Sequence, residues 1–245
     1  MSDNGVNNNA MIDKAMIECM NLTKKYDEFK ALDSLDLNVL KGEIFAFVGP
    51  NGAGKTTTMN ILVGLIAPTS GEAIISGYNL IKNPIEVKKV IGFLPENVSL
   101  YPRLSARQNV RYISDLNGGF AEGKIDEMLD LVGLGKVKDK KAGEFSKGMK
   151  QRLGVACVLV KEPGVLFLDE PTSGLDPTGK LEFQDLMKNL GEAGMTIFYS
   201  SHILGEVKDI ADRVGILHQG RLQKILESGD IGKVEEIYRE ITGIV

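Results

Sequence analysis

A glycine-rich stretch carries the strongest chemical signal in this sequence. Residues 49–56 read GPNGAGKT and match the spacing G-x-x-x-x-G-K-[ST]. Glycines let consecutive backbone N–H groups curl around phosphate oxygens, and the positive end of a following helix points at the same anion. We expect Lys55 to contact the β- and γ-phosphates of a nucleotide and the hydroxyl of Thr56 to ligate Mg²⁺. The predicted nucleotide-binding residues of this loop are Gly49, Pro50, Asn51, Gly52, Ala53, Gly54, Lys55, Thr56 and Thr57.

The flanks of this loop support phosphate binding over a chance glycine-rich turn. The apolar run 44–49 is typical of a buried strand, and the following TTTMNILVGLI has its apolar residues at helical spacing. A strand before the loop and a helix after it are what the phosphate-binding geometry requires. The motif alone does not distinguish a kinase, a GTPase, a helicase and a transporter.

A pair of carboxylates, Asp169 and Glu170, ends the stretch VLFLDE. Ligands of an open parallel sheet lie beyond the C-terminal ends of its strands, so these acids should face the nucleotide. We assign Asp169 to Mg²⁺, directly or through water, and Glu170 to accepting a proton from an attacking water or orienting it. The alternative, two solvated acids at a strand end, is disfavoured by the four bulky apolar residues directly before them.

The elements that must position these residues alternate between strands and helices. A mainly parallel sheet with helices on both faces is expected from this alternation. The expected strands cover residues 17–22, 35–39, 44–49, 165–169, 196–200, 213–217 and 222–226, the last two joined by a hairpin turn at Gln219-Gly220. A helix is also expected over 179–190, and another follows the glycine-rich loop until Pro68, Ser70 and Gly71.

A mainly helical block at about 97–161 interrupts this alternation and is predicted to be an insertion. Ser105 and Gln108 have the spacing of a capping box that opens a helix to about Leu116. Two further helices are expected over 122–132 and from Ser146 to just before Pro163. We find no internal repeat, so the chain holds one such unit.

Composition limits the classes of partner. The 245 residues include 29 Lys and Arg and 33 Asp and Glu, which gives a formal net charge of -4. This charge does not favour binding to nucleic acid or to anionic lipid. The two cysteines, Cys19 and Cys157, lie in apolar surroundings and predict reduced thiols in a cytoplasmic protein. Residues 1–14 are polar and predict a flexible tail. No run of about 18 apolar residues occurs, so a membrane role would require a partner.

Together with three further motifs, these residues resemble the ATP-binding subunits of ABC transporters over nearly the whole chain from about Met16. GPNGAGKTT and VLFLDE are similar to the two nucleotide motifs of that family. Between them, FSKGMKQR at 145–152 resembles the signature usually written LSGGQ. SGLD at 173–176 is similar to the dimer-contacting loop, His202 in SSH lies at the position of the switch histidine, and Tyr26 matches the aromatic that stacks on adenine.

The resemblance implies a fold and a subunit arrangement. The implied fold is α/β, a P-loop NTPase (RecA-like) with a mainly parallel sheet core, an antiparallel β subdomain and an inserted α-helical subdomain, the whole ATPase domain covering 15–240. Four signature residues would cap the γ-phosphate held by a second subunit, and four loop residues would contact that subunit. These are Ser146, Lys147, Gly148 and Met149, and Ser173, Gly174, Leu175 and Asp176 respectively.

Three of these roles have plain structural alternatives. Ser146 has the character of an ordinary helix N-cap. A lone histidine such as His202 is usually structural, although the family position places it near the γ-phosphate, where it would hold Glu170. Tyr26 could be an exposed strand aromatic instead of an adenine platform.

Two positions depart from the family pattern. Glu96 in IGFLPEN stands where the family usually has Gln, and a carboxylate there can also bind Mg²⁺ or its water. Lys147 replaces the first glycine of the signature and Met149 its glutamine. Lys147 would add positive charge near the partner's γ-phosphate and so offset the negative charge of Glu96. By resemblance, these variants and the C-terminal VEEIYREITG are typical of the exporter branch.

The sequence therefore predicts an ATPase whose hydrolysis of MgATP drives transport. Catalysis is assigned to Glu170, His202 and Lys55, and the metal to Thr56, Asp169 and Glu96, with ATP and Mg²⁺ as cofactors. The expected partners are transmembrane permease subunits and a second ATPase subunit, identical or related, on the cytoplasmic face of the membrane. Rival hypotheses are a soluble ABC-like ATPase acting on ribosomes or DNA, a nucleotide kinase or GTPase, and a non-hydrolysing regulatory subunit.

Overall fold

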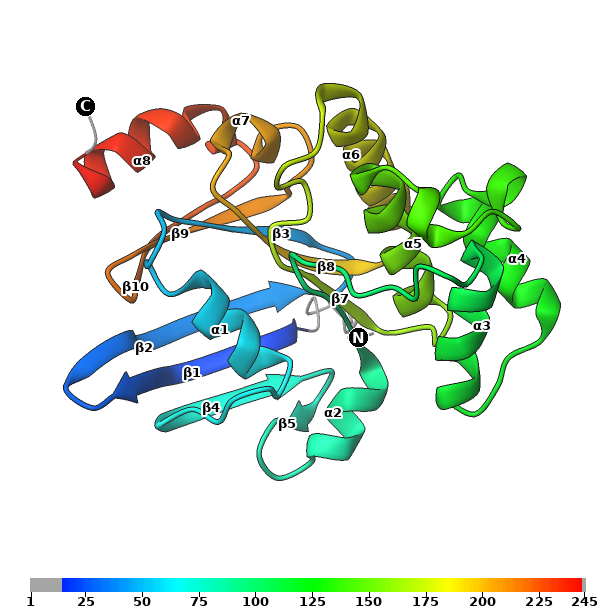
Figure 1. Cartoon of the computed structure of the whole chain (residues 1–245). Coiled ribbons are helices and arrows are strands. Elements are labelled where there is room, and N and C mark those ends of the chain that lie inside the picture. The colour runs from blue at the N-terminus through cyan, green and yellow to red at the C-terminus, as the bar shows by residue number, and fades with distance from the viewer. Residues whose placement is uncertain (1–14, 244–245) are drawn as a thin grey trace, which may run out of the picture.

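Two β-sheets with helices around them make up the structure (Figure 1), a computed structural model that describes residues 15–243. The larger sheet has six strands in the order β10-β9-β3-β8-β7-β6. Strands β3, β6, β7, β8 and β9 run parallel and β10 is antiparallel to β9, which confirms the mainly parallel core. The strand bounds are β3 Ile44–Val48, β6 Ile91–Leu94, β7 Val165–Leu168, β8 Thr196–Ser201, β9 Arg213–His218 and β10 Arg221–Leu226. The predicted tail 1–14 lies outside the described residues.

The β9–β10 hairpin turns where the sequence predicts. Gln219 and Gly220 both have positive φ, 50° and 76°. Positive φ at both central residues is the requirement of a type I′ turn, whose twist matches the flanking strands. This hairpin then packs beside the glycine-rich loop, because the N–H of Gly220 donates to the carbonyl of Ala53 at 2.9 Å.

The smaller sheet is antiparallel, in the order β2-β1-β4-β5. Its strands are β1 Ala15–Tyr26, β2 Phe29–Leu40, β4 Ser70–Ile75 and β5 Tyr78–Asn79. β1 and β2 extend well beyond the expected 17–22 and 35–39. The charged stretch between those predicted strands forms the ends of both strands, and lysines 24 and 25 are not buried there. Alternation in a strand lets such residues point to solvent while their neighbours pack inward.

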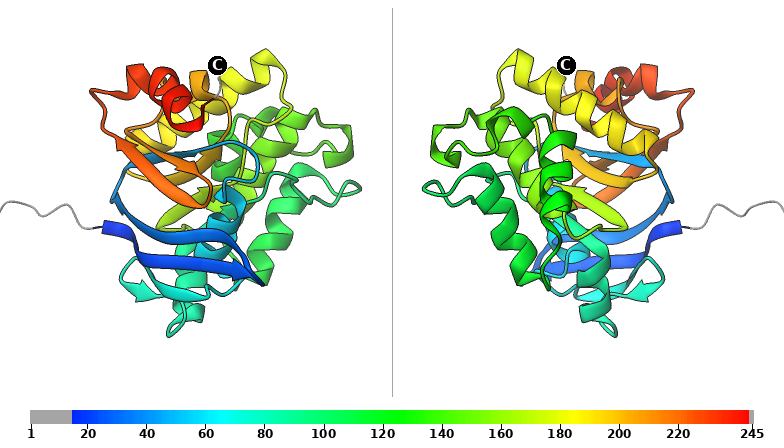
Figure 2. Two further views of the ribbon diagram at one scale, coloured as in Figure 1. Left: turned by 90° about the vertical axis from the view of Figure 1, so that its left-hand side faces the viewer. Right: turned by 90° about the vertical axis from the view of Figure 1, so that its right-hand side faces the viewer.

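Eight α-helices are described between residues 55 and 242. They are α1 Lys55–Leu62, α2 Pro84–Val90, α3 Ala106–Leu116, α4 Glu122–Leu131, α5 Lys147–Leu159, α6 Pro177–Glu192, α7 Leu204–Val207 and α8 Val234–Thr242. Short 3₁₀ turns occupy Gly135–Val137, Ala142–Glu144 and Ile231–Lys233. Helices α3, α4 and α5 gather on one side of the molecule, in green in Figures 1 and 2, and we call them the helical region. The predicted capping box is present, with Ser105 and Gln108 exchanging side chain–backbone hydrogen bonds.

The large sheet separates two apolar cores because its side chains alternate. Ile44, Ala46 and Val48 belong to the core shared with α6 and the helical region, whereas Phe45 and Phe47 belong to the core shared with α1 and the antiparallel sheet. The fully buried Phe198 lies among three other aromatic rings at centroid distances of 5.4–5.7 Å. Such packing holds the strand ends in fixed positions.

Both cysteines are free and buried, as the sequence predicts. Burial raises the pKa of Cys19 to about 12, with a smaller contribution from the charge of Asp36, and burial alone raises the pKa of Cys157 to about 12. A thiol with so high a pKa is neutral near pH 7 and packs as a small apolar group.

Candidate active site

The glycine-rich loop connects β3 to α1 and needs glycine at two positions. A β-carbon on Gly49 would collide with the carbonyl oxygen of Leu217, and one on Gly54 would lie 2.5 Å from the carbonyl oxygen of Ala31. Gly54 also has φ of 111°, which favours glycine. Strand β9 and strand β2 thus hold the loop from two sides. Asn51, Gly52 and Thr56 are exposed, so this part of the loop is open to a ligand.

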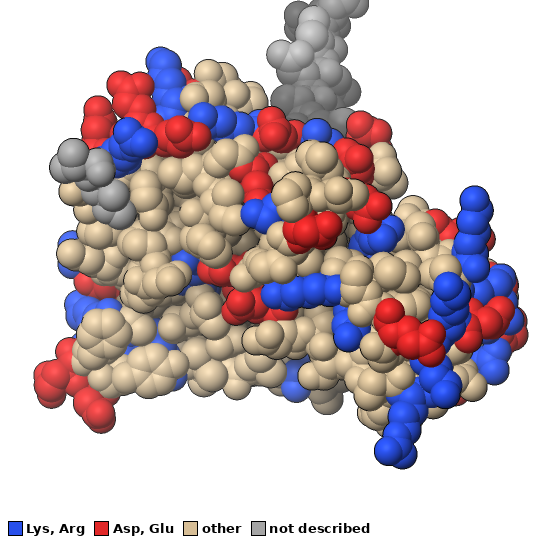
Figure 3. Space-filling model, turned by 45° about the horizontal axis from the view of Figure 1, so that its top comes forward, with Lys and Arg blue, Asp and Glu red and all other residues tan. Residues whose placement is uncertain are grey.

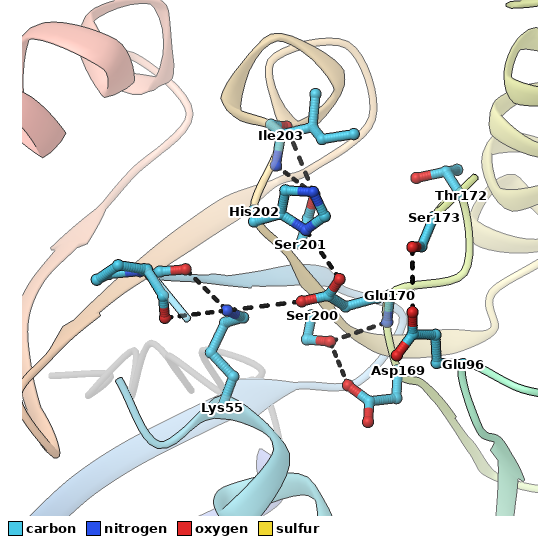
Figure 4. A network of polar contacts seen from close by, with 12 residues as sticks. Lys55, Glu96, Asp169, Glu170, Thr172, Ser173, Ser200, Ser201, His202 and Ile203 are labelled. Carbon is cyan, nitrogen blue, oxygen red and sulfur yellow. Dashed lines mark hydrogen bonds and ion pairs between the residues drawn. The ribbon is translucent and has the colours of Figure 1, made fainter. Parts of the chain in front are cut away.

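Lys55 turns its ammonium group into the loop (Figure 4). Nζ donates to the carbonyl oxygens of Gly49 at 2.8 Å and Pro50 at 3.3 Å, and the side chain is only 5% exposed. Nζ also lies 3.6 Å from Oε1 of Glu170. One buried cation therefore links the glycine-rich loop to the acidic pair.

The acidic pair is fixed by Ser200 from the neighbouring strand β8. Its hydroxyl donates to Oδ1 of Asp169 at 2.6 Å and accepts from the N–H of Glu170 at 2.9 Å (Figure 4). Glu170 has φ of 45°, a conformation that costs energy for a residue with a side chain and that concentrates at functional sites. Ser200 is a residue that the sequence analysis missed, and only its place at the end of a predicted strand signalled it.

Burial raises the pKa of Asp169, and the nearby charges of Glu170 and Glu96 raise it further. The hydrogen bond from Ser200 and the charge of Lys55 act in the opposite direction. Burial makes the ionised form of this carboxyl costly when no ligand is bound, and a cation bound beside it would stabilise that ionised form. The electrostatics at Asp169 therefore favour a bound cation.

His202 completes a row of polar side chains. Its Nδ1 lies 2.8 Å from Oε2 of Glu170, while Oε1 of the same carboxylate faces Lys55 (Figure 4). The imidazole is partly exposed and projects from the end of β8. The structure thus brings together the three residues assigned to catalysis, with the Glu170 carboxylate at the centre.

Glu96 follows β6 and reaches the loop 173–176. Its carboxylate accepts a hydrogen bond from the hydroxyl of Ser173 at 3.1 Å (Figure 4). The next helix, α6, starts with Asp176 as its N-cap, which accepts from the N–H of Gly179 at 3.3 Å. Leu175 is buried and Gly174 is exposed.

Ser146 is the N-cap of α5, the ordinary structural role that the sequence also allows. Its hydroxyl accepts from the N–H of Met149 at 3.2 Å. Lys147 is exposed, Gly148 is buried, and a β-carbon on Gly148 would lie 3.6 Å from Cα of Gly179. Among residues 15–243, no hydrogen bond or ion pair connects this motif to the loop 49–57 of the same chain. The signature residues therefore have no direct polar contact with the glycine-rich loop in the described part of this subunit.

Tyr26 lies at the turn between β1 and β2 and is 48% exposed. Nζ of Lys24 lies 5.0 Å from the centre of its ring. Phe29, which pairs with Tyr26 across the turn, is 63% exposed and was not singled out from the sequence. Two exposed aromatic rings at one turn provide a surface for stacking.

Comparison with known proteins identifies the family. The model of the ABC transporter family matches residues 32–173, more than half of the chain. The chain belongs to the ABC transporter family. It is 44% identical to the bacitracin transport ATP-binding protein BcrA of Bacillus licheniformis over 92% of this chain and 74% of that protein. It is 39% identical to the lantibiotic transport ATP-binding protein SrtF of Streptococcus pyogenes over 91% and 96% of the two chains.

A solved structure of an ABC ATPase shares the fold. The ATP-binding cassette MJ0796, solved as a dimer in a post-hydrolysis state with ADP and Pi, has a TM-score of 0.76 and 28% identity over 87% of this chain and 99% of that one. The P-loop NTPase fold expected from the sequence is thereby confirmed. The confirmed function is that of an ATP-binding, ATP-hydrolysing transporter subunit.

The comparisons also bear on the rival hypotheses and on membrane insertion. The relatives described above are named for transport, and they give no support to an ATPase acting on ribosomes or DNA. In the described part of this ABC ATPase, no helix has both the length and the apolar character needed to cross a bilayer.

Proposed function

We propose that this ABC ATPase powers an exporter, with cargo of the kind that its bacitracin and lantibiotic transport relatives are named for. The contact row Lys55–Glu170–His202 supports the hydrolytic part of the proposal, because the Glu170 carboxylate, our candidate general base, lies against Lys55 of the glycine-rich loop. Glu96 and Lys147, the two departures from the family pattern, support assignment to the exporter branch.

ATP and Mg²⁺ would occupy the edge of the sheet where these residues meet. The hydroxyl of Thr56 and the carboxylates of Asp169 and Glu96 are hard oxygen donors, the type that Mg²⁺ prefers, and the electrostatics at Asp169 favour a cation. Bound Mg²⁺ would neutralise charge on the phosphate oxygens. Lys55 would hold the β- and γ-phosphates, Glu170 would orient the attacking water, and His202 would hold Glu170. The ring of Tyr26 would stack on adenine.

A second subunit would complete the nucleotide site. The N-terminus of α5, headed by Ser146, has first-turn N–H groups without intrahelical acceptors and a positive dipole end, both suited to a γ-phosphate. Its lack of a direct polar contact with the glycine-rich loop in the described residues supports a role toward a partner, and the dimeric structure of MJ0796 provides a precedent. The loop 173–176 would lie at that subunit contact.

A transmembrane subunit would dock on a hollow between the large sheet and the helical region. This hollow has a volume of about 540 Å³. Its apolar wall comes from the end of α1, from β6 and the segment after it, and from α3 and α5, with residues that include Val63, Leu65, Phe93, Leu94, Pro95, Val98, Leu100, Ile113 and Val158. Burial lowers the pKa of Lys161 at its edge. Docking here would place the chain on the cytoplasmic face of a membrane.

Surface charge supports a protein partner over nucleic acid. On the face shown in Figure 3, acidic and basic side chains are interleaved, including over the helical region at the right. Binding to nucleic acid depends on a continuous basic surface that neutralises phosphates.

Leu65→Asp is expected to release the protein from membranes. Leu65 lines the hollow and is 63% exposed, so the variant protein should still fold. The aspartate would, however, place a charge against an apolar partner surface. The measurement is the membrane-bound fraction of the chain in cells that naturally make it. Leu181→Asp is the matched control, because Leu181 on α6 is also 63% exposed and does not line the hollow. Equal membrane binding by both variants and the unaltered chain would contradict docking at this hollow.

A further inference from the structure

The segments that carry Glu170 and His202 are joined by a second contact away from the nucleotide site. Glu170 lies just after β7 and His202 just after β8, and their side chains meet at 2.8 Å (Figure 4). Two residues beyond Glu170, the hydroxyl of Thr172 donates to Oε2 of Glu206 at 2.5 Å. Glu206 lies on α7, four residues beyond His202. These two contacts therefore close a ring of chain that contains both residues proposed for hydrolysis.

The carboxylate of Glu206 is held on both of its oxygens. Oε2 accepts from Thr172, and Oε1 lies 2.9 Å from Nζ of Lys180 on α6. The Glu206 side chain is 12% exposed, and Thr172 is buried. Little water competes for the contact between Glu206 and Thr172, so this charge-assisted hydrogen bond should be strong, and the loss of either partner should be costly.

Helix α7 depends on such contacts for its position. It has only four residues, and its N-cap Ile203 makes no side-chain cap hydrogen bond. Isolated helices shorter than about 12–15 residues are marginal in water, so tertiary contacts must hold α7 in place. Val207 supplies an apolar contact because it is fully buried in the core, and Glu206 supplies the polar one. The path of the chain directly after His202 therefore depends in part on Glu206.

We propose that Glu206 is a positioning residue for ATP hydrolysis, which fastens α7 to Thr172 and so sets how Glu170 and His202 meet. Within residues 15–243, no hydrogen bond or ion pair joins Glu206 to either of them, so its effect passes through the backbone. Glu170 has φ of 45°, a strained conformation that persists only where its surroundings hold it. The contact two residues further along is one such restraint. This inference rests on the proposed roles of Glu170 and His202.

A double-mutant cycle on the full chain with MgATP tests this role. Glu206→Ala and Thr172→Val are each expected to lower kcat about five- to ten-fold, with KM for ATP changed less than about two-fold. The double variant should lose less than about two-fold beyond Glu206→Ala, because both changes remove the same contact. Thr172→Ser keeps the hydroxyl and should retain kcat within about two-fold.

A second cycle shows whether the effect passes through Glu170. In the Glu170→Gln background, Glu206→Ala should lower the residual kcat less than about two-fold, because the carboxylate that it positions is already absent. A general loss of folded protein would instead lower kcat by the same factor in both backgrounds. Glu235→Gln is the matched control, since Glu235 pairs at 2.9 Å with Lys208, the C-cap of α7, and it should leave kcat within about two-fold.

Three results would overturn the role of Glu206. Unaltered kcat in Glu206→Ala, where Glu170→Gln does lower kcat, would show that the contact with Thr172 positions nothing needed for hydrolysis. Losses that multiply in the Glu206 and Thr172 double variant, or that persist in full in the Glu170→Gln background, would show damage unrelated to positioning. Full hydrolysis by Glu170→Gln alone would remove the proposed base, and the role of Glu206 would fall with it. That last failure is recognised in the single Glu170 variant and is thereby distinguished from the other two.

Discussion

Replacing Glu170 with glutamine is expected to lower kcat for ATP hydrolysis by about 10²–10⁴-fold while ATP binding persists. Glutamine has nearly the same shape and can still contact Lys55 and His202, which lie 3.6 Å and 2.8 Å from the carboxylate. It cannot accept a proton from the attacking water. The variant should therefore lose the chemical step and keep the site.

Steady-state hydrolysis and equilibrium ATP binding, measured on the same preparation, check this expectation. Glu235→Gln is a suitable control. Glu235 lies on α8, and the change removes the carboxylate of its ion pair with Lys208. That control should stay within about two-fold of the unaltered kcat. Full hydrolysis by Glu170→Gln would remove the role assigned to this carboxylate.

Lys55→Ala is expected to weaken ATP binding by about 10–100-fold, because the variant loses the charge-assisted hydrogen bonds from the ammonium group to phosphate. Because Lys55 also contacts the carbonyls of Gly49 and Pro50, the alanine removes the cation that closes the loop. Titration with ATP by calorimetry gives the dissociation constant directly.

Two comparisons make the Lys55 result specific. Lys188→Ala removes a half-buried lysine near the end of α6, away from the glycine-rich loop and the signature, and it should bind ATP with unaltered affinity. A melting temperature for Lys55→Ala close to that of the unaltered chain would show that the weaker binding does not come from unfolding. Unaltered affinity in Lys55→Ala would exclude Lys55 as a phosphate ligand.

The sequence predicted the parts of the fold whose chemistry is local. The loop 49–56 and the pair 169–170 are recognisable because residue types and spacing are dictated by phosphate and metal binding. The turn at Gln219-Gly220 and the capping box at Ser105 were predictable for the same reason, since a few neighbouring residues determine each. The predicted domain limits of 15–240 and 97–161 remain predictions.

The features that could not be predicted from the sequence depend on contacts between residues far apart in the chain. Strands β4 and β5 and helix α2 were not predicted, because they are short and their apolar residues show no sustained period. The bridge from Ser200 to Asp169 spans 31 positions and that from Ser173 to Glu96 spans 77, so no local pattern announces either. The roles assigned to Ser146, Tyr26 and the metal ligands also remain predictions, since each depends on a ligand or a partner subunit.

Sedimentation velocity of the Glu170→Gln variant, with and without MgATP, tests the central claim most directly. That claim is that a nucleotide held by the glycine-rich loop of one subunit is completed by α5 of another. A monomer that becomes a dimer only with MgATP, and stays a monomer when Ser146→Arg is added, is the predicted result. A protein that binds and, with Glu170 intact, hydrolyses MgATP while remaining a monomer at all concentrations would contradict the account.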